Sequence, residues 1–315
     1  MHLPDGFLDA RTAIAAGALA AAGVSISLAR FKASANPRLV PLMGLSAAFL
    51  FAAQMVNFPI AGGTSGHLVG SALAAALLGP AAAVLVMCSV LVVQCLLFAD
   101  GGILALGANI LNMAVVAPVI AYAVYRLTCR AMRGERGRVM AVTFSGWCSI
   151  VAASVVCSGE LAWSGVAPWQ LVFPAMTNIH MLIGLAEGLI SALVVAALIR
   201  ARPDLLEGPE EGGRSAAGRA TAVGYGAILA VVLLLFLAPF ASPWPDGLES
   251  VAARLGFESR AVTGSLLPTP IPDYSIPGIG SAAAATLAAG VVGTIAVFLL
   301  AFLLSRMLLP ERGSR

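Results

Sequence analysis

Residues 81–99 read AAAVLVMCSVLVVQCLLFA, a run without a single charged side chain. An α-helix of this length rises about 28 Å, close to the roughly 30 Å hydrocarbon core of a bilayer. The chain is 60% hydrophobic and only 10% charged, a balance found in integral membrane proteins. The sequence therefore predicts an all-α integral membrane protein, folded as a polytopic helical bundle. Further apolar stretches of helical length lie at 12–30, 39–59, 103–127, 139–157, 175–200, 219–241 and 281–309.

The basic residues predict how these helices are oriented. They cluster between alternate apolar stretches, and all clusters fall on one side of the membrane only if the short stretch 67–79 also crosses it. Because cytoplasmic loops carry the excess of Lys and Arg, this pattern predicts nine spans, with the N-terminus outside and the C-terminus inside.

One polar segment divides the chain. Residues 203–218 are rich in Gly, Glu and Pro, which is typical of a linker. We expect a seven-span unit at 1–202 and a two-span unit at 219–315. The loop 242–280 joins the last two spans and is expected to cap the outer surface.

The chain start carries a metal-binding signal. His2 is one of three histidines in 315 residues, and it follows a free α-amino group on Met1. The amine, the amide nitrogen of residue 2 and the imidazole can close a five- and a six-membered chelate ring around one metal ion. A deprotonated amide suits Ni(II) or Cu(II). Since amine and imidazole must be unprotonated, we expect affinity to fall below the histidine pKa.

A fourth ligand must come from elsewhere, and His67 is the best candidate. It ends a Gly-rich loop, 62–67, predicted on the same outer face as His2. Thr64 and Ser65 in that loop can donate hydrogen bonds that orient an imidazole. The alternative interpretation is a frayed terminus and an ordinary loop histidine.

Further polar residues lie in apolar surroundings. In the stretch 175–200, His180 and Glu187 share one helix stripe and predict either a polar lining near the metal path or an interhelical contact. Four asparagines can position the N-terminal loop or form hydrogen bonds with the histidines. Alternatively, they serve as packing contacts between helices. They are Asn57, Asn109, Asn112 and Asn178.

Two motifs resemble a known transporter family. The start MHLPDGFL at residues 1–8 and the loop ending at His67 resemble the M component of nickel/cobalt energy-coupling factor transporters. The resemblance covers about residues 1–200. It implies a seven-helix substrate-binding domain whose metal ligands map onto Met1, His2 and His67. The motif PDGLE at residues 245–249 resembles the signature of the accessory N component, here fused to M.

The resemblance also implies partners and a substrate. A transmembrane T component and two cytoplasmic ATPase subunits would drive uptake across the bacterial inner membrane, and lipid surrounds the spans. The chain itself is not expected to be an enzyme, since ATP hydrolysis lies in those subunits. Residues 4–6 read PDG where the cobalt branch commonly reads Met-Glu-Gly, which favours nickel. Cobalt uptake for cobalamin synthesis is the alternative.

Other functional classes fit parts of the sequence. An intramembrane enzyme would use His180 and Glu187 as acid and base, but lacks a nucleophile or an HExxH motif. A secondary transporter would move protons through Glu187. A structural assembly subunit would bind no metal. Nucleic-acid binding is not expected, because there is no basic tract with interleaved aromatics.

Overall fold

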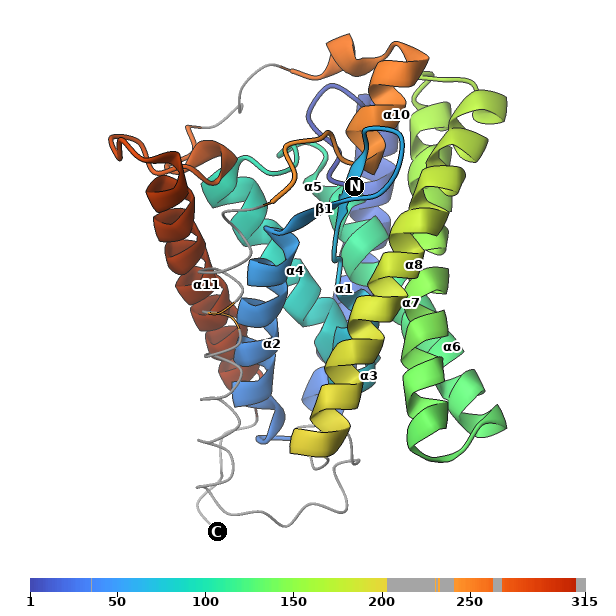
Figure 1. The fold of residues 1–315 in the computed structure, drawn as a ribbon, viewed down its shortest axis with the longest axis vertical. Helices are drawn as coiled ribbons and strands as arrows, with labels where there is room; N and C mark the ends of the chain where they lie inside the picture. Colours follow the sequence, from blue (N-terminus) through green and yellow to red (C-terminus); the bar gives the residue numbers. More distant parts are fainter. Residues whose placement is uncertain (35, 203–229, 231, 233–240, 263–267, 310–315) are drawn as a thin grey trace.

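The computed structural model describes residues 1–34, 36–202, 230, 232, 241–262 and 268–309. In this part of the chain, long helices form a bundle, and the short elements Asn57–Pro59, Leu106–Asn109 and Gly247–Leu255 lie towards the end that holds the N-terminus (Figure 1). The predicted linker 203–218 and nearly all of the predicted helix 219–241 lie outside the described residues. Six described helices are long and apolar enough to cross a membrane: Ala10–Ser34 (α1), Pro80–Phe98 (α4), Leu106–Ala131, Gly134–Trp163 (α7), Trp169–Ala201 (α8) and Ala282–Met307 (α11). The predicted polytopic helical membrane protein is confirmed.

The third of these spans is built from three segments. It comprises α5 (Leu106–Asn109), the π-helical segment η1 (Ile110–Val116) and α6 (Ala117–Ala131). Pro118 has no N–H to donate within the first turn of α6, which suits the change of helical pitch there. The predicted helix 103–127 starts later, because residues before Leu106 form a loop around the chain start.

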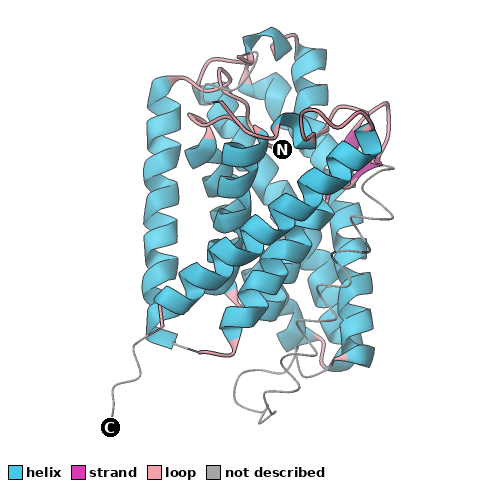
Figure 2. Cartoon of the chain, turned by 90° about the vertical axis from the view of Figure 1, so that its left-hand side faces the viewer, coloured by secondary structure: helices cyan, strands magenta, loops and turns pink. Residues whose placement is uncertain are grey.

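The predicted helix 39–59 is shorter than expected. The helix α2 spans Leu39–Gln54, and the chain then forms a hairpin of β1 (Asn57–Pro59) and β2 (Ser65–His67). The strands are antiparallel, and Asn57 stands opposite His67. Gly62 and Gly63 make the turn with φ of 61° and 75°, a region that favours glycine. Figure 2 shows this hairpin at the same end of the bundle as the N-terminus.

The predicted short span 67–79 is helical only over Ser71–Leu78 (α3). An eight-residue helix covers about 12 Å, too little to cross a bilayer alone. The turn from β2 into α3 is held from another helix, because Glu187 on α8 accepts hydrogen bonds from the N–H groups of Val69 and Gly70 at 2.7 and 2.8 Å. His67 therefore lies in a strand and not inside a span.

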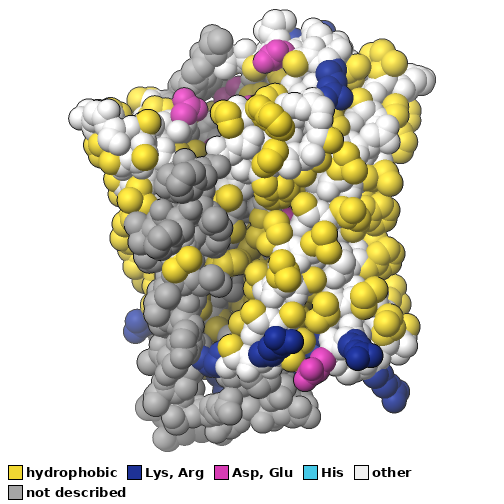
Figure 3. Space-filling view, in the orientation of Figure 1, with side chains coloured by type: hydrophobic (Ala, Val, Ile, Leu, Met, Phe, Trp, Pro, Cys, Tyr) yellow, Lys and Arg dark blue, Asp and Glu magenta, His cyan; other side chains and the backbone are white. Residues whose placement is uncertain are grey.

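The C-terminal part, meaning the described residues 241–262 and 268–309, packs on the first unit at two levels. In the bundle, α11 packs along α2 and α4, and a methyl group on Gly293 would overlap the ring of Phe51. At the outer end, α10 (Gly247–Leu255) lies against α8. Figure 3 shows Lys and Arg gathered mainly at the opposite end, with apolar side chains between the two ends. This distribution supports the predicted orientation, with the N-terminus outside.

Candidate metal site at the chain start

The first nine residues fold back into the bundle. Asn109 holds the main chain of Leu3 from both sides: its Oδ1 accepts from the Leu3 N–H at 2.8 Å, and its Nδ2 donates to the Leu3 carbonyl at 3.1 Å. The carboxylate of Asp5 accepts hydrogen bonds from the N–H groups of residues 103–105 at 2.8 to 3.3 Å. Met1 is 5% exposed, so the alternative of a frayed terminus is wrong.

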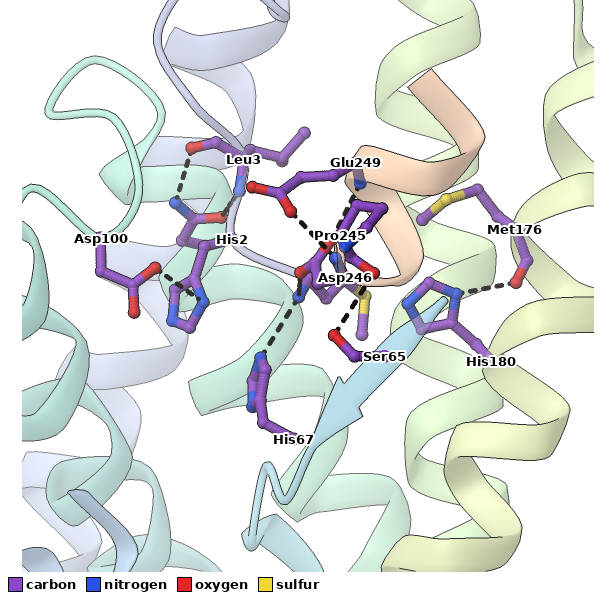
Figure 4. A network of polar contacts seen from close by, with 12 residues as sticks. His2, Leu3, Ser65, His67, Asp100, Met176, His180, Pro245, Asp246 and Glu249 are labelled. Carbon is purple, nitrogen blue, oxygen red and sulfur yellow. Dashed lines mark hydrogen bonds and ion pairs between the residues drawn. The ribbon is translucent and has the colours of Figure 1, made fainter. Parts of the chain in front are cut away.

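The structure brings Met1, His2 and His67 together. The α-amino nitrogen of Met1 lies 3.5 Å from Nε2 of His67. The rings of His2 and His67 stack with centroids 5.4 Å apart and planes at 25°. Figure 4 shows the imidazole of His2, on the chain start, beside Asp100, and the imidazole of His67 reaching towards the same place from below. The three sources of nitrogen predicted from the sequence are thus neighbours in space.

Hydrogen bonding assigns the ring nitrogens of His67. Its Nδ1 lies 3.2 Å from the carbonyl oxygen of Leu68, which can only accept, so Nδ1 carries the proton. The lone pair is then on Nε2, the atom that faces the amine. This loop is fixed by strand pairing with Asn57. It is also fixed by the hydrogen bonds that Val69 and Gly70 donate to Glu187.

Carboxylates face both end groups of the predicted chelate. The amine of Met1 forms a 2.6 Å ion pair with Oδ2 of Asp246. Nδ1 of His2, which would close the six-membered ring, lies 3.2 Å from Oδ1 of Asp100. The other oxygen of Asp100 accepts from the hydroxyl of Tyr274. Two negative charges thus stand beside the place where a divalent cation would bind.

Burial and the Met1–Asp246 ion pair have opposite effects on the pKa values of the groups in the candidate site. Burial lowers the pKa of the Met1 amine, but attraction to Asp246 outweighs it and raises that pKa above 8.0. Burial lowers the pKa of His2 and of His67 below 6.5, and for His67 the nearby positive amine adds to the effect. In the metal-free chain the amine is therefore protonated at neutral pH and the imidazoles are neutral. These directions indicate that the amine, and not a histidine, is the group whose proton must be removed for metal to bind at neutral pH.

The hydroxyls of the Gly-rich loop have a different role from the one predicted. Thr64 Oγ1 lies 2.7 Å from the hydroxyl of Ser250 on α10. Ser65 donates its hydroxyl to the carbonyl of Trp244 at 2.7 Å and its N–H to Pro245 at 2.8 Å. Both residues therefore hold the outer loop of the C-terminal part and do not orient an imidazole.

The remaining predicted residues divide into those near the site and those away from it. His180 lines a cavity of about 10 Å³ together with Met1, His67 and Asp246, large enough for about one water. Its Nδ1 donates to the carbonyl of Met176 at 2.8 Å. Asn178 is exposed on α8 and takes no part in the cluster.

Asn57 contributes its backbone and Glu187 its carboxylate to the site. Asn57 pairs with His67 in the hairpin, and its carbonyl accepts from the N–H of Ser242. Glu187 anchors the turn after His67, so it supports the site from a distance.

Several residues that contact the proposed ligands were not identified from the sequence. Asp246, Asp100 and Gln94 touch Met1 or His2. Asp246 begins the sequence DGLE, which has the spacing of a capping box and signals a helix start; the structure shows both of its hydrogen bonds. Within the described residues, no three His, Cys, Asp or Glu side chains are grouped to hold a metal, so the candidate site depends on main-chain nitrogens.

Known protein families account for most of the chain. Residues 2–205 match the family described as cobalt uptake substrate-specific transmembrane region. The chain belongs to this cobalt-uptake family. Residues 220–309 match the PDGLE domain, so the family's membrane region is here joined to a second domain.

Proteins similar to this chain include fused nickel transport proteins. "Putative fused nickel transport protein NikMN" of Archaeoglobus fulgidus is 41% identical over 97% of this chain and 98% of its own length. "Fused nickel transport protein NikMN" of Rhodobacter capsulatus is 39% identical over 65% of this chain and 64% of its own length. A crystal structure described as a truncated transition metal transporter has 34% sequence identity to this chain and a TM-score of 0.58. The match covers 64% of this chain and 99% of the crystallised chain. The predicted family is confirmed, and the chain is a multi-pass membrane component of nickel or cobalt transport.

Proposed function

We propose that this chain captures Ni(II) for an ATP-driven uptake system of the energy-coupling factor type. The observation that carries the proposal is the meeting of the Met1 amine, the His2 imidazole and His67 at one buried place at the outer end of the bundle. These groups and the amide nitrogen of His2 offer four nitrogens to one ion. That ligand set suits nickel, and in the usual order of stability nickel binds such sites more tightly than cobalt.

Capture requires the ligands to exchange protons for the metal. The amine gives up the proton that Asp246 now attracts, and the amide of His2 gives up its own. The bound ion with one amide anion carries a net positive charge, which Asp246 and Asp100 offset. His67 supplies Nε2, already free of a proton in the metal-free chain.

Transport needs energy from other subunits. The sequence contains no Gly-Lys-Ser/Thr phosphate loop, and its single lysine is Lys32. A transmembrane T component and two cytoplasmic ATPase subunits in a bacterial inner membrane fit this need. In this proposal the unit at 1–202 binds the metal and the unit at 219–315 covers the site.

Cobalt uptake is the second candidate, because the matching family is described by cobalt. Nickel is favoured by the nitrogen ligands and by the names of the two fused relatives. A proton-driven transporter has less support, since both oxygens of Glu187 are engaged by main-chain N–H groups.

The test compares the untagged chain with one that carries two extra residues, Met-Leu, before Met1. Two residues are needed because a histidine in third place could still chelate through the amine and two amides. We expect one nickel per untagged chain by calorimetry and metal analysis. The extended chain, His2→Ala and His67→Ala should lose tight binding, while the exposed control Asn178→Ala should retain it. Stoichiometric nickel on the extended chain would contradict the proposed ligand set.

A further inference from the structure

Two glutamines form a buried chain of hydrogen bonds that ends on His2. Gln54 at the end of α2 and Gln94 on α4 are 6% and 0% exposed. Gln54 Nε2 donates to the carbonyl oxygen of Val69 at 2.8 Å, and Gln94 Nε2 donates to Gln54 Oε1 at 2.8 Å. Gln94 Oε1 lies 3.2 Å from Nε2 of His2. Three bonds thus connect a main-chain carbonyl to an imidazole in series.

The first bond fixes the direction of all the others. A main-chain carbonyl oxygen only accepts, so Gln54 must turn its NH₂ group towards Val69 and its oxygen towards Gln94. Gln94 must then turn its NH₂ group towards Gln54 and its oxygen towards His2. Turning either amide over would place oxygen against oxygen or N–H against N–H in a buried site. Gln94 therefore presents only an acceptor to His2 and favours the proton on Nε2.

A competing acceptor stands on the other side of the ring. Oδ1 of Asp100 lies 3.2 Å from Nδ1 of His2, and a carboxylate there attracts the proton to Nδ1. A proton on Nδ1 would block the atom that closes the six-membered chelate ring. The balance between the glutamine chain and Asp100 decides which nitrogen of a neutral His2 is free.

We propose that Gln54 and Gln94 are positioning residues that hold the proton of His2 on Nε2 and leave the Nδ1 lone pair for the metal. The part that concerns metal rests on the proposed function. The part that concerns the proton is a property of the metal-free chain. Gln54 has no direct contact with His2 in the chain of bonds, so it acts only through Gln94.

The experiment is nitrogen NMR of the metal-free full chain labelled with ¹⁵N-histidine, in which three histidines give few signals. The two tautomers differ in which ring nitrogen has the shift of an N–H nitrogen, and His2→Ala assigns the signals. We expect the proton of His2 on Nε2 in the wild type. In Gln54→Leu and in Gln94→Leu it should move at least partly to Nδ1. Gln170→Leu, the same change at an exposed glutamine, should leave the wild-type pattern.

Nickel binding supplies the second readout. Both leucine variants should bind nickel about 10- to 100-fold more weakly, the usual effect of losing a partner that orients a ligand. A role in packing alone would lower the yield of folded protein and would leave the tautomer of His2 unchanged.

Two results would overturn the proposal. The first is a wild-type His2 with its proton on Nδ1, a measurement that needs no variant to fold. The second is an unchanged tautomer in both folded leucine variants. If the wild type bound no nickel while the tautomer responded, the proposed function would fail and the proton assignment would stand. If nickel bound and the tautomer did not respond, only the glutamine proposal would fail.

Discussion

The carboxylate of Asp246 has two oxygens with two different partners. Oδ1 accepts from the N–H of Glu249 and caps the start of α10. Oδ2 accepts from the amine of Met1. One residue therefore ties the start of the chain to a helix of the C-terminal part, and it raises the pKa of a predicted metal ligand.

We expect nickel affinity to rise with pH, and to rise less steeply once the amine has lost its proton. Binding removes protons from the Met1 amine and the His2 amide, so apparent affinity should increase about a hundredfold per pH unit at first. Above the pKa of the amine it should increase about tenfold per unit. Because that pKa is raised above 8.0 and the imidazole pKa values are lowered below 6.5, the slope should change above pH 8. Calorimetry across this range measures it, and a change near pH 6.5 would contradict the assignment.

Asp246→Asn is the matched variant for this titration. Asparagine caps a helix as well as aspartate, so α10 keeps its cap while the charge beside the amine is lost. The pKa of the amine should then fall, and the change of slope should move to lower pH. Glu249→Gln retains the capping box and the Met1–Asp246 pair and removes only a weaker attraction to the amine, so it should shift the titration less than Asp246→Asn.

At this scale the sequence predicts the nitrogen donors that the structure brings together, but not the residues that contact them. Met1, His2 and His67 were identified from the chemistry of nitrogen donors. Asp246 and Gln94 were not, because their contacts join residues 245 and 92 positions apart and depend on the folded bundle. A glutamine inside an apolar run is nevertheless a readable signal, since a buried amide needs partners.

Among the elements, the β1–β2 hairpin and the turn into α3 set the position of His67. Short apolar runs do not distinguish a helix from a strand, so the sequence predicted a helix to residue 59 and a span from residue 67. The structure ends α2 at Gln54 instead. The decisive contact is the pair of hydrogen bonds that the N–H groups of Val69 and Gly70 donate to Glu187. These residues lie 118 and 117 positions from Glu187 in the sequence.

Glu187→Gln tests this element. A glutamine offers one oxygen in place of two, so one of the N–H groups of Val69 and Gly70 loses its acceptor. We expect a loss of about 1–3 kcal/mol in the free energy of unfolding. Nickel affinity should fall about tenfold through the displaced His67. Thermal unfolding and calorimetry measure both quantities. Glu160→Gln, at a buried glutamate that accepts from Asn112, is the control and should leave nickel affinity unchanged.

Seen as a whole, the molecule places its C-terminal part over the proposed metal site. Asp246 reaches the amine of Met1, and Tyr274 reaches His2 through Asp100. The N–H of Val262 also donates to the carbonyl of Asp5. The sequence predicted the bundle and an outer loop that caps it. It could not predict which residues the loop covers, because no local pattern encodes contacts between the two parts of the chain.

Tyr274 connects the C-terminal part to the first unit through two contacts. Its φ of 53° is strained for an aromatic residue, and such a conformation persists only where surrounding contacts enforce it. Its ring stacks on Phe98 at 4.7 Å, and its hydroxyl donates to Asp100. The ring anchors the segment around Tyr274 on α4, and the hydroxyl connects this segment to Asp100, which contacts the proposed ligand His2.

Tyr274→Phe separates these two contacts. The ring still stacks on Phe98, but the loop loses one bond to a charged acceptor, about 1.5–3 kcal/mol. If the loop must lift before nickel enters or leaves, both rates should rise roughly tenfold or more, with a smaller change in affinity. Stopped-flow mixing with nickel, and then with a chelator, measures the rates. Tyr122→Phe, on α6 beside Arg126, is the control and should exchange nickel like the wild type. Wild-type rates in Tyr274→Phe would show that the C-terminal part does not control access through this contact.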